Sequence, residues 1–412
     1  MEQACEFHPR LTMSLTTSLT TPSPASSFSS AHLSIRLRRI ALPGLFGWFG
    51  LVMGSWAGRI PALRESLQLS HQMLSLVLLC GGLGAVLSFS VSSRLMARFG
   101  ARHSLLIAGS AMLLALTGIG LAPGMPVLML AVLALGVAAS SFDVSMNAVA
   151  AHQEKRTGSS AMSMLHACAC AGGLTGAMLG SLMAGMAVSP ARHFLLLALP
   201  LGMLLKVGHA GIDGIGDSRE KTEHQTRKRR FTLPHGPLVL LGALGFLGTI
   251  AEGSIANWSG IFMKDHFGAS DGIAPLSLTV FSAMMLISRL FGDKLKLRHG
   301  ARKLVCGGAL LAAAGLFFAM LAPNAQWALG GFACAGLGLA LVFPFVFSAA
   351  GRQGSAALAS VATMTYCGSL IGPPLLGAMA QHLGMQMAMG CAGCLGLMIA
   401  LVASRSCLLA RQ

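Results

Sequence analysis

The chain has 412 residues, of which 54% are hydrophobic and only 10% are charged, and its mean hydropathy is +0.71. Soluble domains carry about 25% charged residues, so this composition excludes a water-soluble globular protein. The formal net charge of +16 does not indicate a nucleic-acid partner, because the basic residues are distributed as they are around membrane spans.

The predicted elements are twelve membrane-spanning helices. About 20 apolar residues cross a hydrocarbon core roughly 30 Å thick, and unpaired backbone groups are too costly in lipid for any open structure. The segments lack the apolar–polar alternation of an outer-membrane barrel. In chain order the predicted spans cover residues 40–58, 72–93, 104–122, 127–149, 159–186, 190–207, 237–260, 273–291, 303–322, 326–349, 356–381 and 385–404.

An internal repeat divides these spans into six and six. The stretch Arg98-Phe99-Gly100-Ala101-Arg102 recurs as Arg298-His299-Gly300-Ala301-Arg302, and each copy lies between two apolar spans. Two parallel repeats are typical of secondary transporters, with the ligand site between them. The predicted domains are a disordered tail (1–39), a first repeat (40–207), a linker (208–236), a second repeat (237–405) and a short tail (406–412). Met13 is an alternative start.

The distribution of Lys and Arg predicts the orientation. With the N-terminus inside, only four of the 29 basic residues fall in outer loops: Arg59, Arg64, Arg192 and Lys264. This bias predicts that both termini and the linker lie in the cytoplasm. The linker is expected to be solvated, or alternatively to form a surface helix on anionic lipid headgroups. Trp56, Trp258 and Trp327 fall at predicted outer helix ends, where aromatic belts are expected.

Enzymatic and metal-binding classes find no support. The sequence has no Walker loop, His-x-x-x-His pair or nucleophile elbow. All ten cysteines except Cys5 and Cys407 lie in spans, where cysteine behaves as a small hydrophobic residue. We therefore predict no enzyme activity, no metal and no cofactor, with a proton as the coupling ion.

Two acids, Asp143 and Glu252, fall well inside predicted spans, where carboxylates are costly and functional by default. Asn147 follows Asp143 by four residues and shares its helix face, and His166 lies at a similar depth in the next, antiparallel span. We predict a coupling cluster of Asp143, Asn147 and His166, because a carboxylate in low dielectric takes up protons more readily. The alternative is a structural hydrogen-bond cluster.

A predicted outer gate joins the corresponding parts of spans 1 and 7. Glu252 and Arg59 are expected to meet across the two halves near the outer mouth. The alternatives are that Arg59 only snorkels to the interface and that Glu252 is a fixed structural partner. Arg64 and Glu65 are expected to be solvated. The other cavity or gate candidates are Ser55, Trp56, Asn257, Trp258 and Tyr366, the last occupying the place of His166 in the second repeat.

The loop after the eighth span resembles the signature of the major facilitator superfamily. It carries glycine, aspartate and then arginine-x-glycine-x-arginine, as Gly292, Asp293, Arg298, Gly300 and Arg302. The first copy keeps Arg98, Gly100 and Arg102 but has Ser92 or Ser93 and Ala97 where glycine and aspartate are expected. The resemblance implies an all-α, twelve-helix monomer whose acid and arginines lock the cytoplasmic side, with a weaker lock in the first half.

Shorter phrases resemble a poorly characterised bacterial branch near the fucose-permease-like transporters, and this resemblance implies that the protein lies in the bacterial inner membrane. They are Ala57-Gly58-Arg59-Ile60-Pro61, Ala251-Glu252-Gly253-Ser254 and Gly372-Pro373-Pro374-Leu375-Leu376-Gly377. The prolines in the last phrase remove backbone donors and are expected to kink span 11. In such families spans 1 and 7 both line the central cavity.

The predicted function is proton-coupled secondary transport of a small polar or sugar-like solute by alternating access, with the lipid bilayer and the solute as partners. A proton antiporter for drug-like amphiphiles is the alternative, because the chain holds 25 Met and 20 Phe but a single Tyr. A third possibility is a non-transporting membrane sensor, against which the retained intramembrane acids argue.

Overall fold

The computed structural model describes residues 24–157, 162–213 and 234–410, and within these ranges the regular structure is entirely helical. The helices are α1 (Pro24–Gly58), α2 (Ile60–Ser66), α3 (His71–Gly120), α4 (Met125–Thr157), α5 (Met162–Gly185), α6 (Pro190–Gly211), α7 (Leu238–Phe267), α8 (Leu276–His299), α9 (Ala301–Leu321), α10 (Ala325–Leu339), α11 (Val342–Arg352), α12 (Ser355–Leu383), α13 (Met385–Arg405) and α14 (Cys407–Ala410). The predicted fold class is confirmed.

The helices match the predicted spans in order. Nine stretches of the described residues are long and apolar enough to cross a membrane. One of them, α3, has 50 residues, or about 75 Å of helix, and it contains two predicted spans. Conversely, α10 and α11 together form one span, Ala325–Arg352. The apolar part of α8, Leu276–Gly292, is shorter, and α8 and α12 supply the remaining predicted spans.

The two copies of the repeated motif have the same backbone geometry. Gly100 interrupts α3 with φ 76° and ψ 167°, and Gly300 separates α8 from α9 with φ 76° and ψ 150°. Positive φ is cheap only for glycine, which explains why both copies are centred on this residue. The two copies of the motif therefore form the same local turn in the structure.

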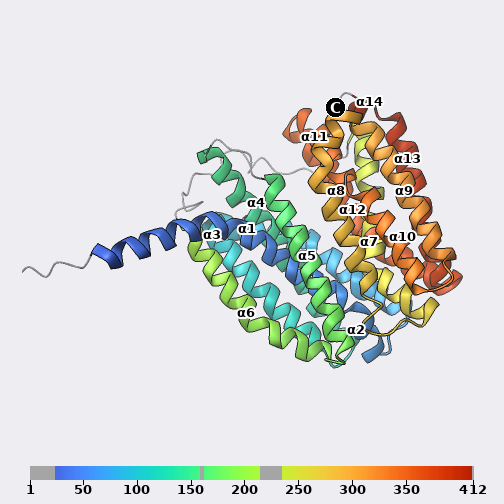
Figure 1. Ribbon diagram of the computed structural model, residues 1–412, viewed down its shortest axis with the longest axis horizontal. Helices are drawn as coiled ribbons and strands as arrows, with labels where there is room; N and C mark the ends of the chain where they lie inside the picture. The colour runs from blue at the N-terminus through green and yellow to red at the C-terminus, as the bar shows by residue number, and fades with distance from the viewer. Residues whose placement is uncertain (1–23, 158–161, 214–233, 411–412) are drawn as a thin grey trace, which may run out of the picture.

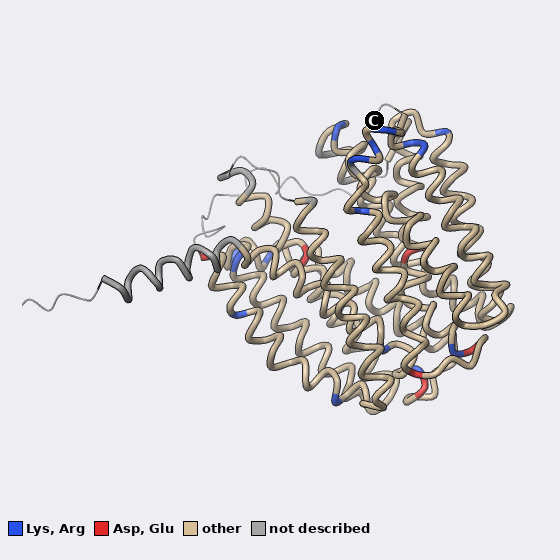
Figure 2. The backbone as a smooth tube through the Cα atoms, in the orientation of Figure 1, with Lys and Arg blue, Asp and Glu red and all other residues tan. Residues whose placement is uncertain are grey.

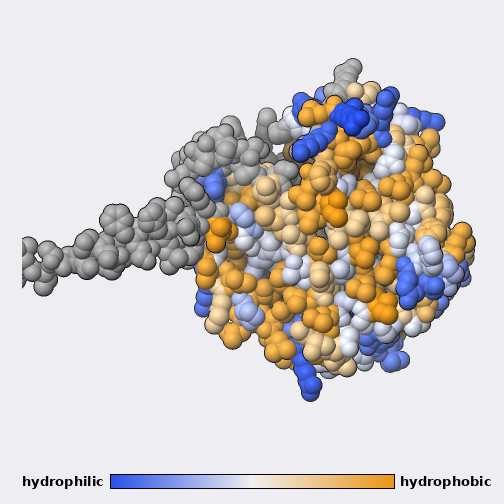
Figure 3. Space-filling view, in the orientation of Figure 1, coloured by the Kyte–Doolittle hydropathy of each residue, from blue (hydrophilic) through white to orange (hydrophobic). Residues whose placement is uncertain are grey.

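Helices α1–α6 and α7–α14 form two bundles that lie side by side, coloured blue to green and yellow to red in Figure 1. We call the end of the molecule with Gly100 and Gly300 the motif side, and the end with α2 and residues 268–275 the α2 side. Lys and Arg gather near the two ends of the helices (Figure 2). Between the ends, the face shown in Figure 3 is mainly hydrophobic, as a lipid-facing surface must be.

Glycines bring α1 and α5 into direct backbone contact. A Cβ atom added at Gly54 would lie 2.9 Å from the carbonyl carbon of Gly173 and 3.0 Å from the nitrogen of Ala177. In the second half, a Cβ at Gly368 of α12 would lie 3.2 Å from the Cβ of Thr249 in α7. Small residues allow such close approach of helices in lipid, and here they fix the pairs α1–α5 and α7–α12.

Three boundary predictions need correction or fall outside the described residues. Helix α1 begins at Pro24, so residues 24–39 of the predicted disordered tail are helical, with proline at a favoured first position. The C-terminal tail contains α14. Residues 1–23, with Met13, and most of the linker (214–233) lie outside the described residues.

Candidate functional site

A cavity of ≈300 Å³ lies within the second half. Helix α7 contributes Thr249, Glu252, Gly253, Ala256 and Asn257, α11 contributes Phe343, and α12 contributes Gly368, Ser369, Gly372 and Pro373. The wall thus combines an acid, an amide and two hydroxyls with apolar surface. This is the composition of a small-molecule site, in which a few polar groups fix the orientation of the ligand.

Glu252 is the central polar group of this cavity. It lies near the middle of α7, between Leu238 and Phe267, and its Oε2 atom is buried without a hydrogen-bond partner among the described residues. Asn257 turns its amide to the carbonyl of Gly253 at 2.8 Å and does not satisfy the acid. An unpartnered buried carboxylate oxygen is costly, so Glu252 is the group in the cavity that most needs a ligand or a proton.

The prolines of α12 add backbone acceptors beside the cavity. Helix α12 continues through Pro373 and Pro374, so the expected kink does not break it. Neither proline has an N–H, and the carbonyls of Ser369 and Leu370 therefore lack their usual helical donors. The Ser369 hydroxyl donates to the carbonyl of Tyr366 at 2.8 Å.

Arg289 is a functional candidate that our sequence reasoning missed. It lies mid-way along α8 (Leu276–His299), where its Nε donates to the carbonyl of Ala340 at 3.2 Å and its Nη1 to Cys170 Sγ at 2.7 Å. Cys170 belongs to the other half of the molecule. The guanidinium is also close enough to Glu252 and His166 to interact electrostatically with both.

Arg289 lies inside the predicted eighth span, 273–291, but no role was predicted for it from the sequence. A signal for its role was present, because it is the only charged residue in the apolar run 273–291. The rule that singled out Asp143 and Glu252 applies equally to a buried base. Arg289 and Glu252 therefore place opposite charges near the middle of neighbouring helices α8 and α7.

The predicted coupling cluster is present in part. Asn147 donates to Asp143 Oδ1 at 3.0 Å and to the Asp143 carbonyl at 2.9 Å, which confirms that the two side chains pair. His166 is exposed and forms no hydrogen bond with either; its ring meets the ring of Phe46 edge-on at 5.4 Å. The predicted placement of His166 in this cluster is wrong, since the imidazole is turned towards α1 and the Arg289 region.

The predicted contact between Arg59 and Glu252 is absent. Arg59 is only 2% exposed, and its guanidinium donates to the carbonyls of Gly180 (3.4 Å) and Val188 within its own half. These carbonyls lie in and after the last part of α5, beside the point where α1 ends. The long side chain of Arg59 therefore satisfies a local turn instead of reaching the cavity, so the prediction is wrong for this conformation.

The other gate candidates take different places. Ser55, Trp56 and Trp258 are buried among the helices, with exposures of 0%, 6% and 0%, and only Asn257 lines the cavity. The predicted aromatic belt holds for Trp327, which is exposed, but is wrong for Trp56 and Trp258. Tyr366 meets the ring of Phe89 edge-on at 5.5 Å, which joins α12 to α3 across the two halves.

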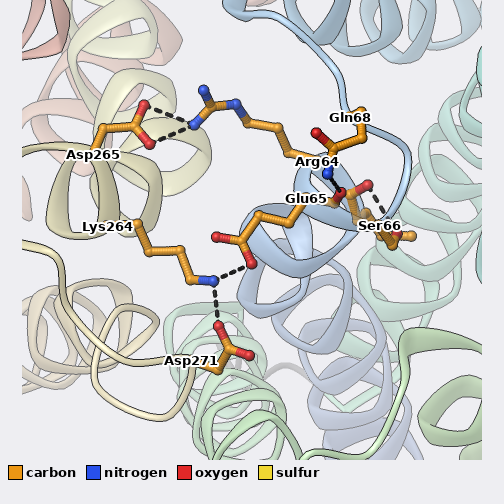
Figure 4. A network of polar contacts seen from close by, with 8 residues as sticks. Arg64, Glu65, Ser66, Gln68, Lys264, Asp265 and Asp271 are labelled. Atoms are coloured by element: carbon orange, nitrogen blue, oxygen red, sulfur yellow. Dashed lines mark hydrogen bonds and ion pairs between the residues drawn. The ribbon is translucent and has the colours of Figure 1, made fainter.

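A network of charges closes the two halves together on the α2 side. Arg64 contacts both oxygens of Asp265 at 2.7 Å, and His71 Nε2 lies 2.7 Å from Asp265 Oδ2. Lys264 reaches Glu65 at 2.5 Å and also contacts Asp271 (Figure 4). We call these six residues the α2-side clasp. The prediction that Arg64 is solvated is therefore wrong, since its side chain is only 19% exposed, whereas Glu65 remains 54% exposed while it pairs with Lys264.

On the motif side, the first copy of the signature is tied down within its own half. Arg102 pairs with Asp213 at 2.7 Å, and the Arg98 guanidinium lies 5.2 Å from the ring centre of Phe99. In the second copy, Arg298 and Arg302 are exposed, and the side chain of Asp293 lies outside the described residues. At Gly292 a Cβ would lie 2.7 Å from Leu341, so this glycine serves close packing. The predicted lock in the second copy stays a prediction.

The described residues contain no group of three His, Cys, Asp or Glu side chains placed to hold a metal ion. The arrangement is instead a polar cavity within the second half and a central arginine whose contacts reach both helical bundles. Such an arrangement can bind a small solute at mid-membrane and, by moving one bundle against the other, expose it to either side.

Comparison with known proteins agrees with this geometry. The family model described as Major Facilitator Superfamily matches residues 49–353 and, in a second match, 241–407. An uncharacterised MFS-type transporter of Yersinia pestis is 32% identical over 356 residues, which cover 85% of this chain and 91% of the relative.

Solved structures show the same fold. A variant of the nucleoside transporter NupG has a TM-score of 0.73 at 12% identity, covering 89% of this chain and 98% of that one. The D-xylose–proton symporter has a TM-score of 0.72 at 16% identity, covering 91% and 97%. The chain belongs to the major facilitator superfamily and is a multi-pass membrane transporter, not an enzyme.

Proposed function

We propose that this protein is a proton-coupled secondary transporter that carries a small polar solute across the bacterial inner membrane by alternating access. The observation that carries the proposal is the unpartnered Oε2 of Glu252 at the wall of a ≈300 Å³ cavity. The cavity's Thr249, Asn257 and Ser369 supply the donors and acceptors that a polar solute needs. The structural neighbours include a nucleoside transporter and a D-xylose–proton symporter, both of which act on polar solutes.

The arrangement of contacts supports an inward-facing conformation. The α2-side clasp joins the halves at one end through Arg64–Asp265 and Lys264–Glu65. The positive-inside rule assigns the opposite, motif side to the cytoplasm. With the outer end closed, the solute site is available from the cytoplasmic side, and the clasp must open for the outward-facing state.

Two carboxylates are candidates for the coupling proton. Among the described residues, the side chain of Asp143 pairs with the neutral amide of Asn147, and Glu252 Oε2 has no hydrogen-bond partner. Protonation removes the cost of an uncompensated charge in a low-dielectric site. When the solute is bound, protonation of either carboxylate therefore favours the carrier that holds both the solute and the proton. The two carboxylates lie in different halves, so proton binding and solute binding affect both bundles.

The test is solute-dependent proton movement in proteoliposomes, with pooled sugars, nucleosides, organic acids and cationic dyes. Asp143→Asn and Glu252→Gln are compared with the wild type, because each amide retains the shape of the acid that it replaces. We expect a polar solute to drive proton flux in the wild type and lose it in the variants.

Each other outcome has a definite meaning. Flux that survives both substitutions overturns the coupling role of the acids. Proton exchange driven by dyes alone identifies an antiporter for amphiphiles. A complete lack of flux with every pool, in protein that is folded by size-exclusion chromatography, overturns the transporter function proposed for this site.

A further inference from the structure

Arg289 carries a charge for which the protein supplies no acidic partner at bonding distance among the described residues. Among the described residues, its hydrogen bonds go to the carbonyl of Ala340 and the thiol of Cys170. A guanidinium has five N–H donors, and a thiol is a weak acceptor. The remaining donors of this residue stay available to a ligand that enters between the halves.

The position of Arg289 costs free energy unless its charge interacts with a ligand or a partner. It lies mid-way along a membrane-spanning helix, where charged side chains are rare and face a cavity or a partner. Glu252 does not neutralise it by direct contact, since Glu252 Oε2 has no partner among the described residues and the guanidinium bonds to Ala340 and Cys170. The molecule thus keeps a cation on α8 apart from a carboxylate on the neighbouring helix α7, and it is the carboxylate that lines the cavity.

We propose that Arg289 binds a carboxylate group of the substrate, while the cavity around Glu252 binds its hydroxyl groups. The substrate class is then a hydroxylated organic acid of sugar size. This inference rests on the proposed transport function and specifies its substrate.

The chemistry of both groups favours this assignment. The planar fork of arginine matches a carboxylate with two parallel hydrogen bonds. Glu252 is an acceptor for hydroxyl donors, and Asn257, Thr249 and Ser369 line the same cavity. A purely neutral sugar would satisfy the cavity and leave the guanidinium without a counter-charge.

Cys170 gives the site a link between the two halves. Its thiol, on α5, accepts a hydrogen bond from Nη1 of Arg289 on α8. A substrate carboxylate is a far better acceptor, so it displaces the thiol and removes a contact that holds the bundles together near mid-membrane. Substrate binding is thereby coupled to the relative movement of the halves, because the ligand interacts differently with the two arrangements.

The test compares acids with neutral analogues of the same carbon skeleton. The probes are D-gluconate against D-glucitol and D-glucuronate against D-glucose, in binding to the purified full-length chain and in counterflow from proteoliposomes. We expect the wild type to select the acids. Arg289→Gln should weaken acid binding by about a hundredfold, as expected on truncation of a buried charge pair, and Arg289→Lys should recover part of it.

Two further variants separate recognition from folding. Arg192→Gln, at an exposed position at the start of α6, is a control that should bind like the wild type. Cys170→Ala removes the competing acceptor and should bind the acids more tightly, a gain that a merely structural role of this contact would not produce. Thermal melting of each variant confirms that it is folded.

Selective transport of neutral solutes, or acid binding by Arg289→Gln at wild-type strength, overturns this inference and leaves the transporter function intact. A wild type that moves neither these probes nor any pool of the first screen overturns the transporter function itself. Weaker acid binding by Cys170→Ala would also contradict the displacement step.

Discussion

Substitution of Asp265 by Asn should open the α2 side of the molecule. Asp265 receives contacts from Arg64 and His71 of the other half, all at 2.7 Å. The side chains of Arg64, His71 and Asp265 retain 19%, 20% and 27% exposure, so each pair should contribute towards the upper end of about 0.2–1 kcal/mol. Losing both should shift the balance between the closed and open α2 side by about 1–2 kcal/mol, or roughly 5–30-fold.

The shift can be measured as a change in distance across the α2 side. Spin labels at Ser66→Cys and Ser270→Cys, both exposed positions, report the separation by double electron–electron resonance when the ten native cysteines are replaced. Asp213→Asn is the matched control, because it removes an ion pair of the same 2.7 Å length within one half. Identical distance distributions for Asp265→Asn and Asp213→Asn would refute the clasp.

Four further variants test the packing and the buried charges by thermal melting in detergent. Gly54→Ala should lower the free energy of unfolding by about 1–3 kcal/mol, because the added Cβ meets the backbone of α5. In the control Gly44→Ala the added Cβ meets nothing within 4 Å, so this variant should be neutral or stabilising. Equal melting temperatures would contradict the role of the glycine contact. Arg59→Met should cost about 1–3 kcal/mol by leaving two carbonyls unsatisfied without changing proton coupling, and a coupling defect in a stable Arg59→Met protein would restore its role as a gate. Glu252→Gln should raise the free energy of unfolding by about 1 kcal/mol while abolishing transport, because a buried group that is kept for function often costs stability. A lower melting temperature would instead indicate a structural partner for this acid.

The fold was predictable because its signals are physical requirements of the bilayer. Long apolar spans, the polar segment 208–236 and the two glycine-centred loops are all visible in the sequence. Gly100 and Gly300 share φ 76° because only glycine adopts this turn readily. The start of α1 at Pro24 was missed because residues 24–39 carry the Ser, Pro and Arg typical of tails, and composition does not report local helical geometry.

The candidate site was predictable only where one helix decides the geometry. The Asp143–Asn147 pair follows from a spacing of four residues. The partners of Arg59 and Arg64 depend instead on where separate helices end relative to one another. A side chain as long as that of arginine can reach several such partners. The predicted contact of Arg59 with Glu252 was based only on their depth in the membrane, but the guanidinium bonds to the carbonyl of Val188.

During transport, the contacts at the α2 side and those at the centre of the molecule must change together. The α2-side clasp is built from partly exposed pairs, which are weak enough for about 1–2 kcal/mol to open. A substrate that gains only that much from the rearranged halves is sufficient to shift the equilibrium several-fold. Arg289 is placed to supply this difference, because the thiol that it contacts belongs to the opposite half. The carboxylate that replaces the thiol then weakens the central contact, leaving the clasp as the main barrier to the outward-facing state.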